Sequence, residues 1–247
     1  MKVYQGIILG FVQGLTEFLP VSSSGHIILT EKLLGVNGGL FFSLLLHAGT
    51  LFAVAMTKSK VIRRMNGKFA ARLIIATVPA GAVGVFLGDF VDKAFFGGKF
   101  LWLGFLITAA YLFVAETKYK PKKTLVTTKD AVWLGFSQAV AVVPAISRSG
   151  AVFSTGLLLG IDKKTLSDFT FLMSIPVILG GIAYELVKGF FNGGWGNIAV
   201  MPTLFGGIAA FVSGTLAVYF VEKVYINGKT RWFSVYLCAL SLILLMV

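Results

Sequence analysis

The segment between residues 9 and 35 recurs 125 residues later in the chain, without a gap. Eleven of its positions are identical in the two copies, more than chance gives over so short a stretch. Each copy contains a serine-rich turn that ends in glycine, Ser22-Ser23-Ser24-Gly25 in the first and Ser147-Arg148-Ser149-Gly150 in the second. The chain is therefore built from two related halves, and the repeated turns indicate where a functional site is expected.

The composition around these turns is typical of a helical membrane protein. Of the 247 residues, 57% are hydrophobic and 13% are charged, which excludes an ordinary soluble domain. Crossing a bilayer takes about 20 apolar residues, and stretches near this length fall at 39–56, 73–91, 98–116, 167–188, 202–222 and 231–247. We therefore expect an all-α membrane protein with six transmembrane helices. It would form a single domain, with repeat 1 at about 1–116 and repeat 2 at about 130–247.

The two repeated segments differ from these six stretches because each is interrupted in its middle by proline, serine and glycine. They divide into 5–19 with 26–36, and 130–143 with 151–160. Since neither half is long enough to span alone, each pair is expected to form a re-entrant helical hairpin. Three crossings separate the hairpins, so they would enter from opposite faces of the membrane. The expected arrangement is an inverted repeat whose hairpin tips meet near the midplane.

The basic residues predict the orientation of the chain. Sixteen of the 22 lysine and arginine residues lie in or beside four loops, at 57–72, 117–129, 161–166 and 223–231. These loops are expected in the cytoplasm and both termini outside. The net charge of +12 then reflects topology and contact with anionic membrane lipids, and no nucleic acid partner is expected. The sequence leaves open whether the chain acts alone or as a homodimer.

Broken helices that meet at the midplane direct their unpaired N–H groups at a shared centre. The inner helices are expected to start near His26 and Ala151. Serine hydroxyls and Arg148 crowd the same place, which predicts an anion site, most naturally for phosphate. The residues expected to bind the substrate are Gln13, Ser22, Ser24, Ser147 and Ser149.

Three ionisable residues sharpen this prediction. An intramembrane carboxylate costs roughly 2.5–3.5 kcal/mol unless it is paired, so Glu17 is either functional or bound in a structural salt bridge to Arg148. The guanidinium of Arg148 suits bidentate phosphate recognition. His26 follows the first serine turn, where it is either an acid or base or a satisfied structural histidine. His47, within a spanning segment, is expected to be a core residue.

Two motifs carry a resemblance to a known family. The run from Gln13 to His26 resembles the first motif of the undecaprenyl-diphosphate phosphatase family, the integral-membrane bacitracin-resistance type, in which Glu or Gln precedes a Glu by four residues. The run from Pro144 to Gly150 is similar to its second motif, Pro-Gly-x-Ser-Arg-Ser-x-x-Thr. Ala145 and Val152 stand where that motif has glycine and threonine. The likeness covers essentially the whole chain.

This resemblance implies hydrolysis of a polyprenyl diphosphate to the monophosphate and inorganic phosphate, which recycles the lipid carrier for cell-envelope glycan synthesis. It implies a divalent cation, Mg²⁺ or Ca²⁺, held by Glu17, with Ser23 as nucleophile and His26 as acid or base. Gln13 would pair with Glu17, and Ser147 with Arg148 would grip the diphosphate. The alternative is a transporter or flippase of polyprenyl phosphate or phosphate that uses the same anion site. A transporter has no need of a serine beside Glu17, which favours the enzyme.

Overall fold

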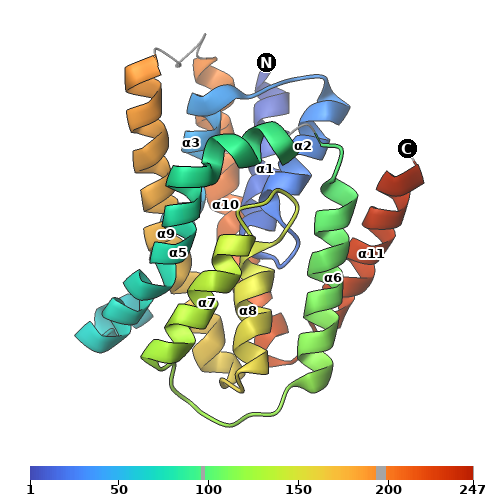
Figure 1. Cartoon of the computed structure of the whole chain (residues 1–247). Coiled ribbons are helices and arrows are strands. Elements are labelled where there is room, and N and C mark those ends of the chain that lie inside the picture. Colours follow the sequence, from blue (N-terminus) through green and yellow to red (C-terminus); the bar gives the residue numbers. More distant parts are fainter. Residues whose placement is uncertain (96–97, 193–198, 247) are drawn as a thin grey trace.

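The computed structural model describes residues 1–95, 98–192 and 199–246, and within these ranges the chain forms helices and no sheet (Figure 1). The helices in the described ranges are α1 (Val3–Phe18), α2 (Ser23–Leu34), α3 (Gly39–Thr57), α4 (Ser59–Arg64), α5 (Gly67–Phe95), α6 (Leu101–Lys118), α7 (Thr128–Val140), α8 (Arg148–Leu158), α9 (Lys163–Asn192), α10 (Val200–Ile226) and α11 (Arg231–Met246). The all-α prediction is confirmed.

Five helices in the described ranges are long and apolar enough to cross a membrane. They are α3, α6 and α10 over their whole length, α5 over Gly67–Gly88, and α9 over Lys163–Phe191. These five coincide with five of the six expected crossings. The sixth stretch forms α11, whose 16 residues extend about 24 Å at 1.5 Å per residue. Because the hydrocarbon core is about 30 Å thick, a sixth full crossing stays a prediction.

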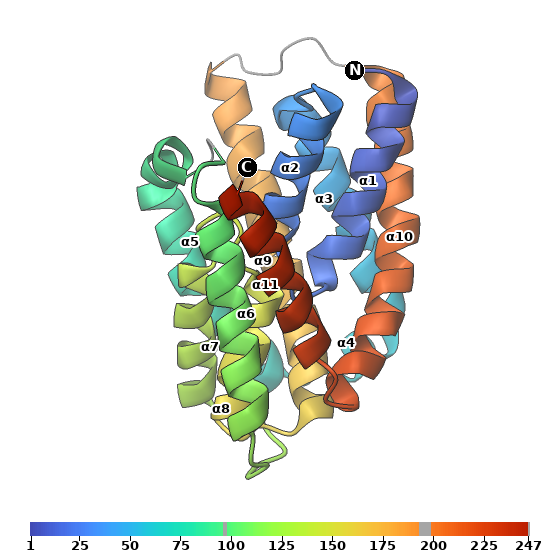
Figure 2. The same ribbon diagram turned by 90° about the vertical axis from the view of Figure 1, so that its right-hand side faces the viewer.

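The interrupted segments form two helical hairpins that point at one another. In Figure 1, α1 and α2 lie in the half of the bundle that contains the N-terminus, whereas α7 and α8 lie in the opposite half. The turns of the two hairpins come together between these halves, and the view in Figure 2 agrees with this arrangement. The C-terminus lies toward the same end as the N-terminus. Residues 125 positions apart thus converge on the middle of the molecule.

The inner helices begin earlier than the sequence suggested, at Ser23 and Arg148 rather than near His26 and Ala151. The reason is N-capping, because a serine oxygen can satisfy an otherwise unpaired N–H of the first turn. Ser22 Oγ accepts a hydrogen bond from the Gly25 N–H at 3.4 Å, and Ser147 Oγ accepts one from the Gly150 N–H at 3.1 Å. The last two serine or arginine positions of each repeated turn therefore belong to a helix.

Glycine spacing brings α1 against α10. A Cβ added at Gly6 would lie 2.3 Å from the backbone oxygen of Pro202, and one added at Gly10 would lie 2.0 Å from that of Gly206. Only glycine permits two helix backbones to approach so closely. This contact fixes α1, and with it the position of Glu17 one turn before the hairpin tip.

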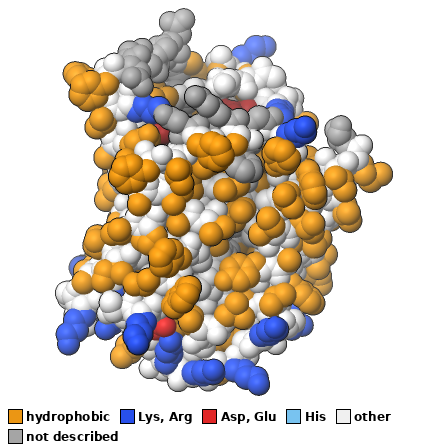
Figure 3. Space-filling model, viewed as in Figure 1, with side chains coloured by type: hydrophobic (Ala, Val, Ile, Leu, Met, Phe, Trp, Pro, Cys, Tyr) orange, Lys and Arg blue, Asp and Glu red, His pale blue; other side chains and the backbone are white. Residues whose placement is uncertain are grey.

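The basic loops lie at the end of the bundle away from the N-terminus. On the face seen in Figure 3, lysine and arginine side chains gather at this lower end, and hydrophobic side chains cover the middle. A partly buried ion-pair network ties the helices together there. Lys58, whose side chain is 4% exposed, lies 2.9 Å from Asp168 and 2.9 Å from Glu222, and Lys164 contacts the same two carboxylates. Its charges balance, as burial of charged groups requires.

Candidate active site

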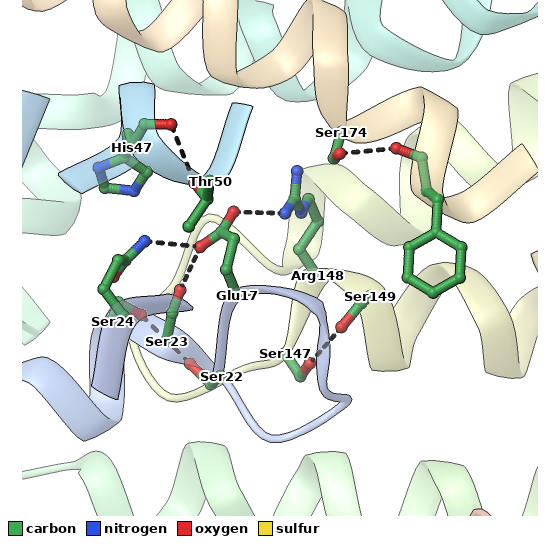
Figure 4. A network of polar contacts seen from close by, with 12 residues as sticks. Glu17, Ser22, Ser23, Ser24, His47, Thr50, Ser147, Arg148, Ser149 and Ser174 are labelled. Atoms are coloured by element: carbon green, nitrogen blue, oxygen red, sulfur yellow. Dashed lines mark hydrogen bonds and ion pairs between the residues drawn. The ribbon is translucent and has the colours of Figure 1, made fainter. Parts of the chain in front are cut away.

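The two hairpin turns touch through side chains from both halves of the chain (Figure 4). Nη2 of Arg148, at the start of α8, lies 2.5 Å from Oε1 of Glu17 at the end of α1. Ser149 Oγ donates a hydrogen bond of 2.9 Å to the carbonyl oxygen of Leu19. The contact expected between the two repeated motifs is therefore present, and the structural salt bridge weighed from the sequence is part of it.

Glu17 is the centre of this contact. Glu17 is 7% exposed, and each of its carboxylate oxygens has a partner. Oε1 faces Arg148, while Oε2 accepts hydrogen bonds from Gln13 Nε2 at 2.9 Å and from Ser23 Oγ at 2.7 Å. Charge-assisted hydrogen bonds of this kind keep a buried carboxylate ionised and fix its direction. The geometry places a serine hydroxyl beside a base, which is the arrangement that activates a nucleophile.

Arg148 has one side free. Nη2 binds Glu17, but Nη1 is buried and has no hydrogen-bond partner among the described residues. A buried guanidinium N–H without an acceptor is costly, so an anion in the adjacent space would satisfy it. The ion pair with Glu17 occupies one arm of the guanidinium, and the other arm has a donor left over. A phosphate-binding role for Arg148 stays a prediction.

Most of the other predicted serines stabilise the turns. Ser22 and Ser24 lie 3.2 Å apart through their hydroxyls, and Ser147 and Ser149 also lie 3.2 Å apart. Together with the two N-caps, these contacts explain four of the five serines as parts of the hairpin tips. Ser23 differs because its hydroxyl turns to Glu17. A substrate-binding role for the other four stays a prediction.

Ala145 stands where the family motif has glycine, and its backbone is in the left-handed region. Ala145 has a φ of 67°, a conformation that costs a residue with a side chain about 1 kcal/mol or more. Its carbonyl accepts from Thr108 Oγ1 at 3.4 Å, and the same oxygen of Thr108 accepts from the Ser147 N–H at 3.0 Å. These contacts hold the strained turn. Val152 is buried in the core of the bundle, away from the cavity described below.

The two histidines lie in different surroundings, and only His47 departs from its expected place. Both ring nitrogens of His26 have partners, with Nδ1 at 2.7 Å from the Ser22 carbonyl oxygen and Nε2 at 2.7 Å from the Tyr236 hydroxyl. His26 does not line the cavity that contains Glu17, so its role as acid or base stays a prediction that these contacts do not favour. His47, expected in the core, does line that cavity, with Nδ1 at 2.9 Å from the Ser43 carbonyl oxygen.

A cavity of about 900 Å³ opens over Glu17, Ser23 and Arg148. It runs between α2, α3 and α9 toward Glu31 and Lys188, nearer the end with the termini. Apolar side chains alternate with these polar groups on its walls, among them Ile27, Ile28, Leu40, Leu44, Val177 and Ile182. A cavity of this size with a polar floor and apolar walls suits a ligand with an anionic head and a hydrocarbon tail.

A divalent cation fits the floor of the cavity only when substrate phosphates supply some of its ligands. The described residues hold no group of three or more His, Cys, Asp or Glu side chains that could bind a metal. Beside the hairpin turns Glu17 offers a carboxylate, and the Gln13 and Ser23 oxygens are adjacent to it; the Glu31 and Glu185 carboxylates line other parts of the same cavity. Mg²⁺ is usually bound through one or two carboxylates together with substrate phosphates, so this donor set fits a cation that arrives with a diphosphate.

Comparison with known proteins matches the whole chain to one group. A family model described as bacitracin resistance protein BacA matches residues 6–243. An undecaprenyl-diphosphatase of Carboxydothermus hydrogenoformans is 38% identical over 256 residues, covering 100% of this chain and 98% of that protein. Undecaprenyl-diphosphatases of Bacteroides fragilis and Alkaliphilus metalliredigens are 37% and 35% identical, over 100% and 96% of this chain and 98% and 95% of theirs. The likeness therefore includes both hairpins.

Proposed function

The chain belongs to the bacitracin resistance protein BacA family, and we propose that it is an undecaprenyl-diphosphatase. It hydrolyses undecaprenyl diphosphate to undecaprenyl monophosphate and inorganic phosphate, which returns the lipid carrier to cell-envelope glycan synthesis. The observation that carries the chemistry is the 2.7 Å hydrogen bond from Ser23 Oγ to Glu17 Oε2, beside an arginine with an unpartnered nitrogen.

The reaction proceeds in two steps. Ser23 Oγ attacks the terminal phosphorus as Glu17 Oε2 takes its proton; the bond from that phosphorus to the bridging oxygen breaks, and the monophosphate leaves with this oxygen. Water then attacks the phosphoserine and the bond to Ser23 Oγ breaks as Glu17 returns the proton to that oxygen; both protons of the water leave with the inorganic phosphate, as H₂PO₄⁻. Arg148 Nη1 and the N-terminal ends of α2 and α8 stabilise the phosphoryl oxygens in both steps.

We propose that Glu17 also holds a divalent cation, Mg²⁺ or Ca²⁺, together with the diphosphate. The cation supplies neutralisation of phosphate charge when bound. Gln13 contributes by fixing Glu17 through its amide N–H. Turnover that persists unchanged after exhaustive chelation would count against this assignment, and restoration by added Mg²⁺ or Ca²⁺ would support it.

For the membrane, we propose six crossings and two re-entrant hairpins in an inverted repeat, formed by halves at about 1–116 and 130–247. α11 supplies the sixth crossing, and the basic loops at 57–72, 117–129, 161–166 and 223–231 face the cytoplasm. Both termini then lie outside. The positions of the five long apolar helices and the gathering of basic side chains at one end support this orientation. The catalytic cavity opens toward the outer face.

Phosphate release from undecaprenyl diphosphate by the purified protein tests the function. The wild-type chain should release phosphate, and the matched variant Ser23→Ala should release almost none. A transporter of polyprenyl phosphate would use the anion site without cleaving its ligand. Movement of labelled lipid across vesicles, with no phosphate release under any condition, would replace the enzyme with that alternative.

A further inference from the structure

A second, smaller cavity lies at the basic end of the bundle, and none of its lining residues belongs to the hairpin motifs. Its volume is about 230 Å³, and it is formed by α4 and the start of α5. Lys60, Arg64 and Asn66 line it with polar side chains, and Val61, Met65 and Phe69 provide an apolar wall. The ring of Phe69 packs in a T-shaped contact with that of Phe169 of α9, at a centroid distance of 5.5 Å, which anchors this wall.

The polar groups of this cavity are donors. Neither the Lys60 nor the Arg64 side chain has an ion-pair or hydrogen-bond partner among the described residues. The Asn66 side-chain oxygen is used locally, since it accepts from the Phe69 N–H at 2.9 Å, and this leaves the amide NH₂ as a donor. No acidic side chain lines the cavity. A set of donors without an acceptor selects an anion.

The neighbouring cations are treated differently by the fold. Lys58, two residues before Lys60, is neutralised by Asp168 and Glu222. Across the same end of the bundle, Lys123 is paired with Asp130 at 2.6 Å. The nearby carboxylates thus pair with other lysines, and within the described part of the chain the charge around the small cavity has no counter-ion.

The place of the cavity distinguishes between anions. The apolar span of α5 begins at Gly67, between Asn66 and Phe69, so the cavity lies at the boundary between a loop and a membrane-spanning helix. This is the depth of lipid head groups. A phosphodiester with glycerol and acyl chains attached would use both the cationic rim and the apolar wall, whereas a free phosphate would use the rim alone.

We propose that this cavity binds the head group of an anionic phospholipid from the leaflet at the basic end. The proposal goes beyond the diphosphatase reaction and rests only on α5 spanning a membrane. Lys60 and Arg64 bind the phosphate oxygens, Asn66 donates to them, and Val61, Met65 and Phe69 contact the adjoining carbon atoms. Each basic side chain near an anionic lipid contributes about fivefold in affinity, so the pair contributes about 30-fold.

Native mass spectrometry of the full chain in neutral detergent tests this site, with phosphatidylglycerol and phosphatidylcholine as probes. We expect wild type to retain phosphatidylglycerol in preference to phosphatidylcholine. Lys60→Gln combined with Arg64→Gln should weaken that binding about 30-fold, and Arg64→Gln alone about fivefold. The matched control is Lys120→Gln with Lys122→Gln, which removes the same charge from an exposed loop at the same end.

Three results would overturn the proposal. Equal weakening in the control pair would show that net charge alone attracts the lipid. Equal retention of both phospholipids would show that the cavity does not distinguish an anionic head group from one without net charge. Displacement of phosphatidylglycerol by an equal concentration of inorganic phosphate would assign the cavity to free phosphate. Diphosphatase turnover should be unchanged in all variants. This result would show that the variants are folded and that lipid binding at this cavity is independent of the proposed reaction.

Discussion

Removing one member of the Glu17–Arg148 pair should damage both stability and turnover, and restoring charge balance should repair only stability. Breaking a fully buried ion pair costs about 3–5 kcal/mol because one charge is left uncompensated. Here the side chains are 6% and 18% exposed and line a cavity, so about 2–3 kcal/mol is expected for Glu17→Gln or Arg148→Met. In the double variant no charge remains, and most of this loss should disappear.

The turnover of the same three variants should not follow their stability. Glu17 is assigned as the base for Ser23 and Arg148 as the phosphate clamp, so each single variant should lose at least about 100-fold. The double variant should be as inactive as the singles, because neither function is restored by charge balance. The two effects therefore separate the structural role of the pair from its chemical role.

The assay combines two measurements on each purified variant. Reversible unfolding in mixed detergent micelles gives the free energy of unfolding, and phosphate release from a short-chain prenyl diphosphate gives kcat and KM. The coupling free energy is the deviation of the double variant from the sum of the singles. If the double variant recovers turnover along with stability, the pair is only a structural salt bridge and the proposed mechanism is wrong.

Four further outcomes are expected. Ser23→Ala should remove nearly all phosphate release, whereas Ser24→Ala should cost about fivefold, since a second hydroxyl of the turn contributes about 1 kcal/mol; equal effects would refute serine catalysis. Tyr225→Phe should leave the free energy of unfolding unchanged or raise it by about 1 kcal/mol, because the buried hydroxyl has no partner with hydrogen-bond geometry among the described residues; a clear loss would mean that water or the nearby Ser149 hydroxyl satisfies it. Gly10→Ala should destabilise the protein by about 1–3 kcal/mol through its clash with Gly206, while Gly81→Ala, with nothing within 4 Å, should not. Cysteines placed at Met65 and Thr124 should be labelled from the same, cytoplasmic face, and labelling from opposite faces would contradict the topology.

The sequence predicted the long helices and the contact between the hairpins because both depend on local patterns. An apolar run of about 20 residues has few alternatives to a spanning helix, and the repeat predicted that Glu17 and Arg148 would meet. α4 was not predicted, since its six residues, Ser59–Arg64, include three cations and no apolar run. Its position follows from the buried contacts of Lys58 with distant carboxylates, which no local pattern reveals.

The histidines show why side-chain direction is harder to predict than helix position. α3 is apolar on most of its circumference, so periodicity does not show which face of it borders a cavity. His47 was therefore indistinguishable from a core residue until α9 was placed beside it. His26 turns to Tyr236, which lies 210 residues later in the chain. Proximity to the serine turn suggested catalysis, but a distant hydroxyl determines where the ring lies.

The two hairpins are similar in sequence but carry different residues at the positions that matter for the proposed reaction. This difference explains why one reaction centre forms where they meet. The position equivalent to Ser23 is Arg148, and the position equivalent to Glu17 is Val142. Nucleophile and base thus come from one hairpin and the phosphate clamp from the other, which suits a substrate with one scissile bond. Gln138, the equivalent of Gln13, instead donates to the Ala76 carbonyl oxygen at 3.4 Å in the helix that contains Pro79.

The environment of Gln138 shows how the second hairpin became a scaffold. Pro79 lacks the N–H that would bind the Ile75 carbonyl oxygen one turn earlier, and Gln138 donates to the next carbonyl along α5, that of Ala76. Gly135 allows the approach, because a Cβ there would lie 2.8 Å from the Ala76 oxygen. α7 therefore uses the inherited glutamine and glycine to pack against α5, and this packing holds Arg148 opposite Glu17.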